Sequence, residues 1–287
     1  MSETPVKSIA ITGGASGLGR ELALRYARAG WRVAIADRND ERGEATLREL
    51  QQTAADAHYQ HLDVTDAGAI DAWRDALLSR WGQIDVLINN AGIASHGGVA
   101  ESSLEDWAAV LDINLMGVVR GCRAFSQVMK QQGHGHIVNI ASMAGLIHSP
   151  EMASYNASKA AVVALSETML FELAPFGIGT TVVCPGFFQT NLAESTRSPD
   201  AGARDYVNKM LASSELSAAD IADQVFSAVA ANRFLLLPHK SYRNTFYWKR
   251  YLPTLYHRRM ADYGIKLAAR RQTITITQPQ ATDGVNE

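Results

Sequence analysis

The sequence predicts an α/β fold: a doubly wound, Rossmann-like parallel sheet of about seven strands in a single domain, with a basic, aromatic C-terminal extension. Three observations support this prediction. Short apolar runs rich in β-branched residues alternate with helical patterns along most of the chain. A glycine-rich turn follows the first of these runs and leads into a helical pattern. The composition shifts after Leu237 toward basic and aromatic residues. A length of 287 residues and a hydrophobic content of 47% suit one large core.

The apolar runs predict the strands and the patterns between them predict the helices. Strands are expected at about residues 6–11, 31–36, 58–62, 84–88, 136–140, 179–183 and 234–237. Helices are expected up to about residue 29 after the first strand, and at about 40–52, 67–81, 104–131, 154–175 and 217–231. Ser154 is predicted to cap the helix that runs to about Pro175. Strands that alternate with helices in this way are typical of a parallel sheet.

The glycine-rich turn indicates a dinucleotide site. It reads T-G-G-A-S-G-L-G over Thr12–Gly19, between a strand and a helix, where backbone N–H groups and the helix N-terminus can face a pyrophosphate. Asp37 ends the second strand, 18 residues after Gly19, near where an acidic residue would bond the adenosine ribose hydroxyls. Arg38 follows and could instead meet a 2′-phosphate. A tight turn without a ligand, and a turn or cap role for Asp37, are the alternatives.

Ser142, Tyr155 and Lys159 form the candidate catalytic group. Ser142 follows a predicted strand at its C-terminal end, where open α/β sheets bind their ligands. Tyr155 and Lys159 lie four residues apart and share a helix face. A nearby ammonium lowers the pKa of a phenol, which could then exchange a proton with an alcohol or carbonyl oxygen that Ser142 holds in place. An ordinary helix pair is the alternative.

Composition and charge exclude several other classes. The net charge of −2 gives no general attraction to nucleic acid. Two cysteines, Cys122 and Cys184, lie far apart in apolar surroundings, as expected for a reduced, cytoplasmic protein. The N-terminus has no signal-peptide pattern, and no apolar run is long enough to span a membrane. The eight histidines show no metal-ligand spacing, so we expect no metal site.

The C-terminal extension is the region that the sheet does not explain. Residues 240–271 hold nine Lys or Arg against one acidic residue, with aromatic residues interleaved. We expect a catalytic domain over 1–238, a helical extension over 239–271 that packs on the core with its aromatic residues mostly buried, and a flexible tail over 272–287. Capping of the substrate pocket and a subunit interface are variants of this packing. Binding to an anionic membrane surface, which would make the protein peripheral to a membrane, and binding to nucleic acid are the alternatives.

The motifs together resemble a known family. They are T-G-x-x-x-G-x-G at Thr12–Gly19, N-N-A-G at Asn89–Gly92, Asn114, Ser142, Y-x-x-x-K at Tyr155–Lys159, and Pro185-Gly186 through Thr190. Their order and spacing resemble the short-chain dehydrogenases/reductases of the ordinary single-domain type, over about residues 6 to 237. The resemblance implies an oxidoreductase that transfers a hydride between a nicotinamide cofactor and an alcohol or carbonyl compound. A non-catalytic dinucleotide-binding redox sensor is the alternative.

The resemblance also implies roles for individual residues. Tyr155 would be the general acid-base, Lys159 would lower its pKa and hold the nicotinamide ribose, Ser142 would anchor the substrate oxygen, and Asn114 would hold a water. The residues expected to contact the cofactor are Gly13, Ser16, Gly17, Leu18, Gly19, Asp37, Arg38, Asp63, Val64, Asn90, Ala91, Gly92, Tyr155, Lys159, Pro185, Gly186 and Thr190. Asp37 favours NAD as the cofactor, with NADP possible through Arg38.

The substrate and the assembly are less closely specified. Phe187, Phe188 and Leu192 follow the Pro185-Gly186 motif, and they indicate either an apolar substrate or ordinary loop packing. The partners that we expect are a small hydrophobic alcohol or carbonyl compound and further copies of the chain, as a homodimer or homotetramer. We expect no nucleic acid as a partner.

Overall fold

The computed structural model describes residues 6–189, 194, 197–198 and 214–277. The chain divides into two compact units, Met1–Arg243 and Asn244–Glu287. The first unit contains the sheet and the candidate site, and the second contains most of the C-terminal extension.

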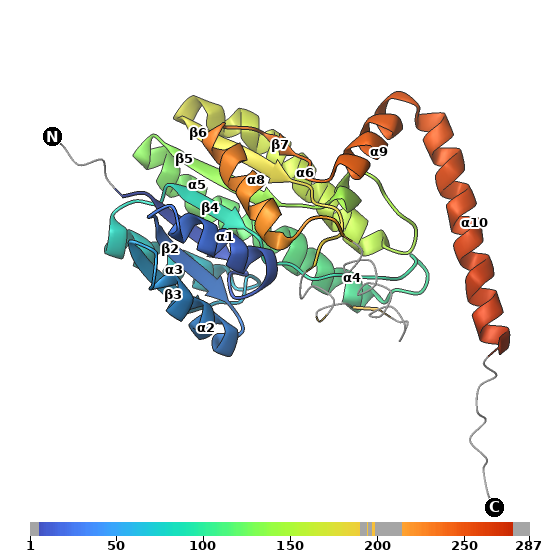
Figure 1. The fold of residues 1–287 in the computed structure, drawn as a ribbon, viewed down its shortest axis with the longest axis horizontal. Coiled ribbons are helices and arrows are strands. Elements are labelled where there is room, and N and C mark those ends of the chain that lie inside the picture. Colours follow the sequence, from blue (N-terminus) through green and yellow to red (C-terminus); the bar gives the residue numbers. More distant parts are fainter. Residues whose placement is uncertain (1–5, 190–193, 195–196, 199–213, 278–287) are drawn as a thin grey trace, which may run out of the picture. The chain divides into compact units, whose positions relative to one another are not determined.

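The first unit is built on a sheet of seven parallel strands (Figure 1). The strands are β1 (Ser8–Thr12), β2 (Arg32–Asp37), β3 (Asp56–His61), β4 (Val86–Asn89), β5 (Gly135–Ile140), β6 (Ile178–Val183) and β7 (Leu235–Leu236). Their order in the sheet is β3-β2-β1-β4-β5-β6-β7, which confirms the predicted doubly wound fold. The chain reverses its direction across the sheet between β1 and β4, the point at which such sheets bind dinucleotides.

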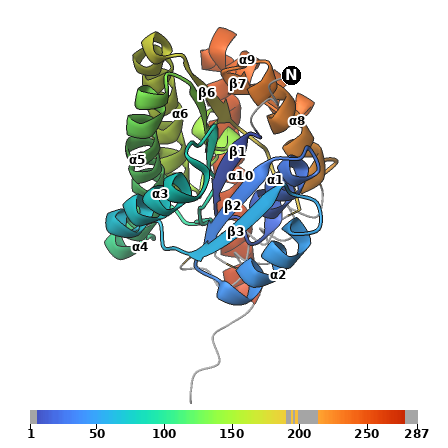
Figure 2. The ribbon, with the colours of Figure 1, turned by 90° about the vertical axis from the view of Figure 1, so that its left-hand side faces the viewer.

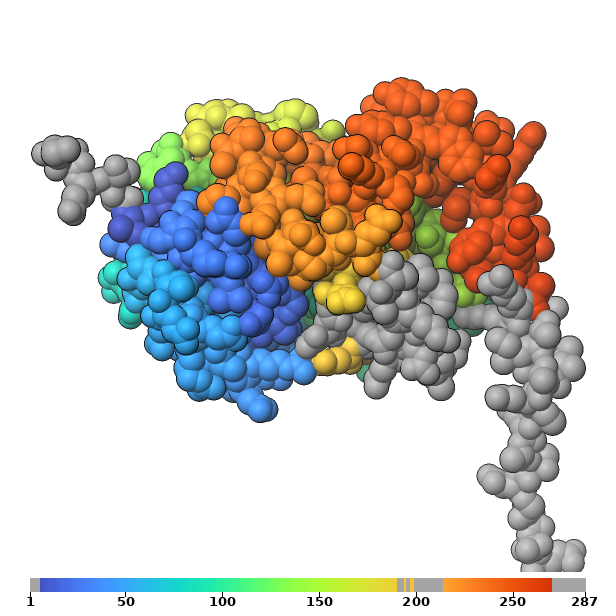
Figure 3. Space-filling view, in the orientation of Figure 1, coloured from blue at the N-terminus to red at the C-terminus, as the bar shows by residue number. Residues whose placement is uncertain are grey.

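Helices cover both faces of the sheet (Figure 2). One face carries α1 (Gly17–Ala27), α2 (Asp40–Leu50) and α8 (Ala218–Ala230), and the other carries α3 (Ala67–Trp81), α5 (Gly117–Gln132) and α6 (Ala153–Leu173). Because both faces are covered, β1 and β4 are buried along their whole length. Helices α1 and α8 lie side by side, and their atoms adjoin on the surface seen in Figure 3. Arg25 joins them, because it pairs with Asp223 and stacks on Phe226.

The long helical region predicted over about 104–131 is present as α4 (Leu104–Leu111), a π-helical turn (Asp112–Met116) and α5 in direct succession. The π turn contains Asn114, whose side chain bonds backbone outside the helix, as described below. One helix cap needs correction. Ser154 does not cap α6, which begins at Ala153 after Met152. The Ser154 hydroxyl is buried and lies 2.9 Å from the hydroxyl of Ser95, so a tertiary hydrogen bond has taken the place of the expected cap.

The extension is helical, as predicted, with α9 over Lys240–Tyr251 and α10 over Pro253–Thr277. Helix α10 continues past Arg271, where the extension was expected to end. The extension over 239–271 has seven aromatic residues. Tyr256 is the one that is buried, and Tyr247, Tyr251 and Tyr263 are exposed. The burial of most of these residues against a core domain stays a prediction. Among the residues that the structure describes, none of the helices combines the length and apolar composition needed to cross a bilayer.

Candidate active site

A cavity of about 440 Å³ lies at the carboxyl ends of the central strands. At one end it is lined by the glycine-rich turn and by Asp37, and at the other by Ser142, Tyr155 and Lys159. All of the predicted site residues that the structure describes line this cavity, except Gly19 and Asn114, which lie just behind its wall. Thr190 falls outside the described residues.

The glycine-rich turn brings backbone N–H groups to the cavity. Gly13 and Gly17 have φ values of 65° and 52°, in the left-handed region that favours glycine. A side chain at Gly19 would place its Cβ 2.0 Å from the carbonyl oxygen of Gly13, so glycine is needed there for close packing. Ser16 makes no capping bond to α1 through its side chain. The first N–H groups of α1 can therefore bind an anionic group such as a pyrophosphate.

Asp37 lies beside this turn at the end of β2. Its carboxylate accepts hydrogen bonds from the backbone N–H of Ala15 (3.1 Å) and of Asn39 (3.0 Å). Arg38 is exposed and lines the cavity. Arg42 lines it as well, and its guanidinium pairs with the carboxylate of Glu194 at 2.8 Å. With Asp63, this end of the cavity thus presents three carboxylates and two guanidinium groups, and one carboxylate and one guanidinium are already joined in an ion pair.

The turns after β3 and β4 complete the cofactor end. Asp63 accepts bonds from the backbone N–H and the hydroxyl of Thr65, and these bonds lower the pKa of its carboxyl group. The side-chain amide of Asn90 donates to the carbonyl oxygens of Thr12 and Gly13, at 3.1 and 2.9 Å. Asn90 therefore fastens the glycine-rich turn to the end of β4 and fixes its shape.

Asn114 is fully buried and its side chain is occupied by protein groups. Its amide oxygen accepts from the N–H of Ile93 (2.8 Å), and its amide nitrogen donates to the carbonyl oxygen of Ile93 (2.9 Å). The hydroxyl of Ser158 lies 3.4 Å from the same nitrogen. These bonds hold the loop after β4 against the π turn and α6. The part of Asn114 in holding a water stays a prediction.

Tyr155 and Lys159 lie one turn apart on α6, and both are buried and line the cavity, so the predicted shared face is confirmed. The hydroxyl of Ser142, the last residue before a 3₁₀ turn (Met143–Gly145), is hydrogen-bonded to Tyr155. Lys159 Nζ donates to the carbonyl oxygen of Ile140 at 3.0 Å and lies 5.8 Å from the centre of the Tyr155 ring. An acid-base group, a hydroxyl donor and an ammonium therefore meet in one place.

Burial governs the proton affinities of this pair. It raises the pKa of Tyr155, and the hydrogen bond with Ser142 opposes this shift. It lowers the pKa of Lys159 to about 8. Loss of solvation therefore sets the direction of both shifts, and the lowering of the Tyr155 pKa by Lys159 stays a prediction. Ser142 is the residue that favours the phenolate here.

Several cavity residues have no motif in the sequence that could have identified them. They include Arg42, Glu194, Ile147, Met152 and Tyr242. Phe187 and Phe188, which the sequence indicated for an apolar substrate, do line the cavity. Near Ser142 the wall is mostly apolar, with Ile93, Ala94, Met143, Ala144, Ile147, Met152, Phe187 and Phe188. Among the described residues, no cluster of histidine, cysteine and acidic side chains could hold a metal ion.

Comparisons with known proteins agree with this geometry. The family model of the short chain dehydrogenases matches residues 7–201. A probable oxidoreductase, EphD of Mycobacterium tuberculosis, is 36% identical over 230 residues, which make up 77% of this chain and 39% of that protein. This chain thus spans about two fifths of the length of that relative. Cyclopentanol dehydrogenase of Comamonas testosteroni is 35% identical over 198 residues, which make up 69% of this chain and 79% of that enzyme.

Solved structures give the same result. The crystal structure of a short chain dehydrogenase/reductase from Burkholderia phymatum in complex with NAD superimposes with a TM-score of 0.83 and 34% sequence identity. The match covers 89% of this chain and 96% of that protein. Because the family model covers more than half of the chain and the fold and the motifs agree with it, this chain belongs to the short-chain dehydrogenase/reductase family of NAD(P)-dependent oxidoreductases.

Proposed function

We propose that the protein is an NAD-dependent dehydrogenase that interconverts an apolar alcohol and its carbonyl compound, with Tyr155 as the general acid-base. The observation that carries this proposal is the meeting of Tyr155, Ser142 and Lys159 at one end of a cavity whose other end fits a dinucleotide. A redox sensor would need the dinucleotide end alone.

The residues present fit a nicotinamide dinucleotide. The N–H groups at the start of α1 suit the pyrophosphate, and Asp37 suits the two ribose hydroxyls. A 2′-phosphate would meet the charge of Asp37, and Glu194 already pairs with Arg42, which could otherwise have offset that charge. We therefore propose NAD as the preferred cofactor. When it is bound, the nicotinamide accepts the hydride from the alcohol or supplies it to the carbonyl compound.

The chain's own residues move the proton. In alcohol oxidation, Tyr155 removes the proton from the hydroxyl group of the substrate, and in the reverse direction it returns a proton to the carbonyl oxygen. Ser142 then turns its single hydroxyl hydrogen to the same substrate oxygen and holds that oxygen in place. Lys159, fixed to the carbonyl oxygen of Ile140, keeps a cationic group behind the tyrosine. The apolar wall near Ser142 excludes water and receives the carbon skeleton of the substrate.

Cyclic secondary alcohols are the first substrates to test, because the wall is apolar and a relative is named cyclopentanol dehydrogenase. Reduction of NAD would be followed by its absorbance with a panel of cyclic and acyclic alcohols and, in reverse, with the matching ketones and aldehydes. We expect turnover to increase with the apolar surface of the substrate up to the size of the cavity. Tight NAD binding without turnover on the whole panel would favour the redox sensor instead.

For the extension we propose packing against a core domain, of the same chain or of a second copy. Residues 240–271 are strongly basic and residues 1–239 hold 18 basic against 26 acidic residues, so the two regions attract each other. The exposed side chains of the second unit include Tyr251, Leu252 and Ile265, which an interface would cover. Truncation after Arg243 should convert a dimer or tetramer into monomers in light scattering. Unchanged assembly, with full-length protein that sediments with anionic vesicles, would favour membrane attachment.

A further inference from the structure

After β7 the chain returns to the catalytic end of the cavity through His239 and Tyr242, both within the first unit. The imidazole of His239 is buried, and its Nδ1 accepts a hydrogen bond of 3.1 Å from the backbone N–H of Gly186. Tyr242 lines the cavity. Both residues begin the extension over 239–271, for which capping of the substrate pocket was one expectation, and neither has a part in the proton transfer described above.

The ring of Tyr242 packs directly on Gly186. A Cβ atom at Gly186 would lie 2.2 Å from Cε2 and 2.3 Å from Cδ2 of this ring, closer than any real contact. The backbone of Gly186 does not have a positive φ, so the ring rather than the backbone conformation requires glycine here. The rings of His239 and Tyr242 meet edge to face with their centres 5.7 Å apart. The two side chains thus form one surface under Gly186.

The hydrogen bonds around Gly186 converge on a single peptide group. The N–H of Gly186 and the carbonyl group of Pro185 belong to the same planar unit. That carbonyl oxygen accepts a bond of 2.9 Å from the N–H of Met143 and lies 3.5 Å from the hydroxyl of Ser142. Because this peptide group is rigid, the hydrogen bond at the N–H of Gly186 also fixes the position of the Pro185 carbonyl oxygen relative to Ser142 and Met143.

We propose that His239 and Tyr242 form a latch that fixes the Pro185–Gly186 peptide and thereby positions Ser142 for the reaction. His239 supplies the acceptor for the N–H edge of this peptide, and Tyr242 blocks its displacement on the side of the cavity. Both are positioning residues that act through Pro185–Gly186 and Ser142. The proposal rests on the function proposed above only for its kinetic consequences, because the state of the peptide can be measured without turnover.

The first test replaces His239 with residues of different acceptor geometry. In His239→Asn, the side-chain Oδ1 atom can replace Nδ1 as the acceptor for the N–H of Gly186. In His239→Gln the amide oxygen lies one carbon farther from the backbone, and in His239→Leu the side chain has no acceptor. Hydrogen exchange at Gly186 should be slow in the wild type and in the Asn variant, and at least about tenfold faster in the Gln and Leu variants, since an N–H without its acceptor opens to water. Equal exchange in the Asn and Gln variants would overturn the proposal.

The same variants separate kcat from cofactor binding. We expect kcat with an alcohol substrate to fall by about tenfold or more in the Gln and Leu variants, and to recover in the Asn variant. The dissociation constant of NAD should change less than kcat does, because the glycine-rich turn and Asp37, which would hold the pyrophosphate and the ribose, lie at the other end of the cavity from Pro185–Gly186. Lys240→Gln, an exposed position next to the latch, is the control and should behave as wild type.

The second test is a double-mutant cycle for the ring contact. Gly186→Ala should reduce kcat by about tenfold or more in the wild type, because its new methyl group meets the Tyr242 ring. In a Tyr242→Ala background, the same Gly186→Ala change should cost less than about twofold. Equal losses in both backgrounds would show that the ring does not set the requirement for glycine, and would remove Tyr242 from the latch.

The outcomes also separate this proposal from the function. If the wild type turns over none of the alcohols or carbonyl compounds, the proposed function fails, while the exchange rates at Gly186 still decide whether His239 holds the peptide. If the wild type is active and the Leu variant matches it in both exchange and kcat, the function stands and the latch is wrong.

Discussion

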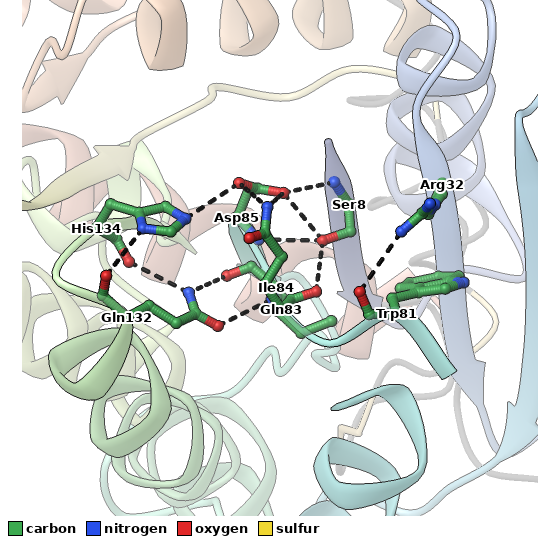
Figure 4. Close-up of polar contacts among 8 residues, drawn as sticks. All are labelled: Ser8, Arg32, Trp81, Gln83, Ile84, Asp85, Gln132 and His134. Atoms are coloured by element: carbon green, nitrogen blue, oxygen red, sulfur yellow. Dashed lines mark hydrogen bonds and ion pairs between the residues drawn. The ribbon is translucent and has the colours of Figure 1, made fainter. Parts of the chain in front are cut away.

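Polar residues gather at both ends of the central strands, but they stabilise the fold at the amino end and line the cavity at the carboxyl end. At the amino end, polar groups from β1, the turn before β4 and the turn after α5 bond one another (Figure 4). Asp85 accepts from the N–H of Ser8 at 2.7 Å and lies 3.5 Å from Nε2 of His134, and Gln132 bonds both the N–H and the carbonyl oxygen of Ile84 at 3.0 Å. None of these residues lines the cavity.

At the carboxyl end, the same strands finish in side chains that face a cavity. Asp37, Ser142 and Tyr155 each have a bond within the chain, yet each also lines open space where a ligand can bind. Polar residues whose hydrogen-bonding groups are all used within the protein stabilise the fold. Polar residues with hydrogen-bonding groups still facing a cavity can bind a ligand and act on it. Substitutions at the two ends should therefore affect different measurements.

The largest effect should come from the carboxyl end. Tyr155→Phe removes the proposed proton carrier, and we expect kcat to fall by about 10²–10⁴-fold with the NAD dissociation constant and the unfolding temperature nearly unchanged. Tyr26→Phe is the matched control, because its hydroxyl is buried remote from the cavity and has no partner among the described residues. A Tyr155→Phe enzyme that keeps more than about a third of wild-type kcat, with chemistry rate-limiting, would contradict the assignment.

The next effect belongs to the amino end of β5 and to stability. Burial lowers the pKa of His136 to about 4 from its usual 6.5, so the unfolded chain binds more protons than the folded one between these values. Stability should therefore decrease as pH falls from about 6.5 to about 4, by up to about 3 kcal/mol from this residue. His136→Gln cannot take up that proton, so its urea-unfolding free energy should decrease less over the same range. Parallel pH curves for the two proteins would be the contrary result.

A smaller loss of stability is expected from Asp85→Ala. The change leaves the N–H of Ser8 without its acceptor, which should cost about 2 kcal/mol in chemical denaturation and leave kcat unchanged. Asp75→Ala, which removes an exposed carboxylate that pairs with Arg74, serves as the control and should leave the unfolding free energy nearly unchanged. A loss of kcat in Asp85→Ala without a loss of stability would break the distinction between the two ends.

The smallest effect should be a change of cofactor preference. Asp37→Asn keeps acceptor and shape but removes the charge, so the preference for NAD over NADP in kcat/KM should fall by about five- to tenfold. The bonds to Ala15 and Asn39 make this a cleaner change than truncation, since the amide oxygen can accept at least one of them. A wild-type enzyme that already prefers NADP would overturn the role given to Asp37.

The sequence allowed prediction of those parts of the structure that depend on residues close together in the chain. The strands and the glycine-rich turn were predictable because β-branched runs and a T-G-x-x-x-G-x-G turn are short-range features. The latch was not, because His239 and Tyr242 meet Gly186 across more than 50 residues, and nothing beside them in the sequence marks the contact. The π turn was missed for the same reason, since Asn114 bonds Ile93 across 21 residues.

Electrostatics and exposure were the other limits. The spacing of Tyr155 and Lys159 predicted a shared face, but it could not show that both would be buried deeply enough for desolvation to dominate their pKa values. Burial of the aromatic residues of the extension was predicted only from how many of them occur in a short segment. Whether Tyr247 or Tyr251 is covered depends on what lies against it, which a sequence pattern does not specify.

The pairing of β1 with β4 has a consequence for how the protein is made. Ser8 and Asp85 lie 77 residues apart, so during synthesis β1 can pair with β2 long before β4 leaves the ribosome. Until then the β4-facing edge of β1, a run of Ile9, Ala10 and Ile11, has no strand beside it and is open to pairing with other nascent chains. Arrival of β4 closes that edge and, through Asn90, locks the glycine-rich turn in the same step. Closure of this edge of β1 and competence to bind a nucleotide should therefore come together, at one moment in biogenesis.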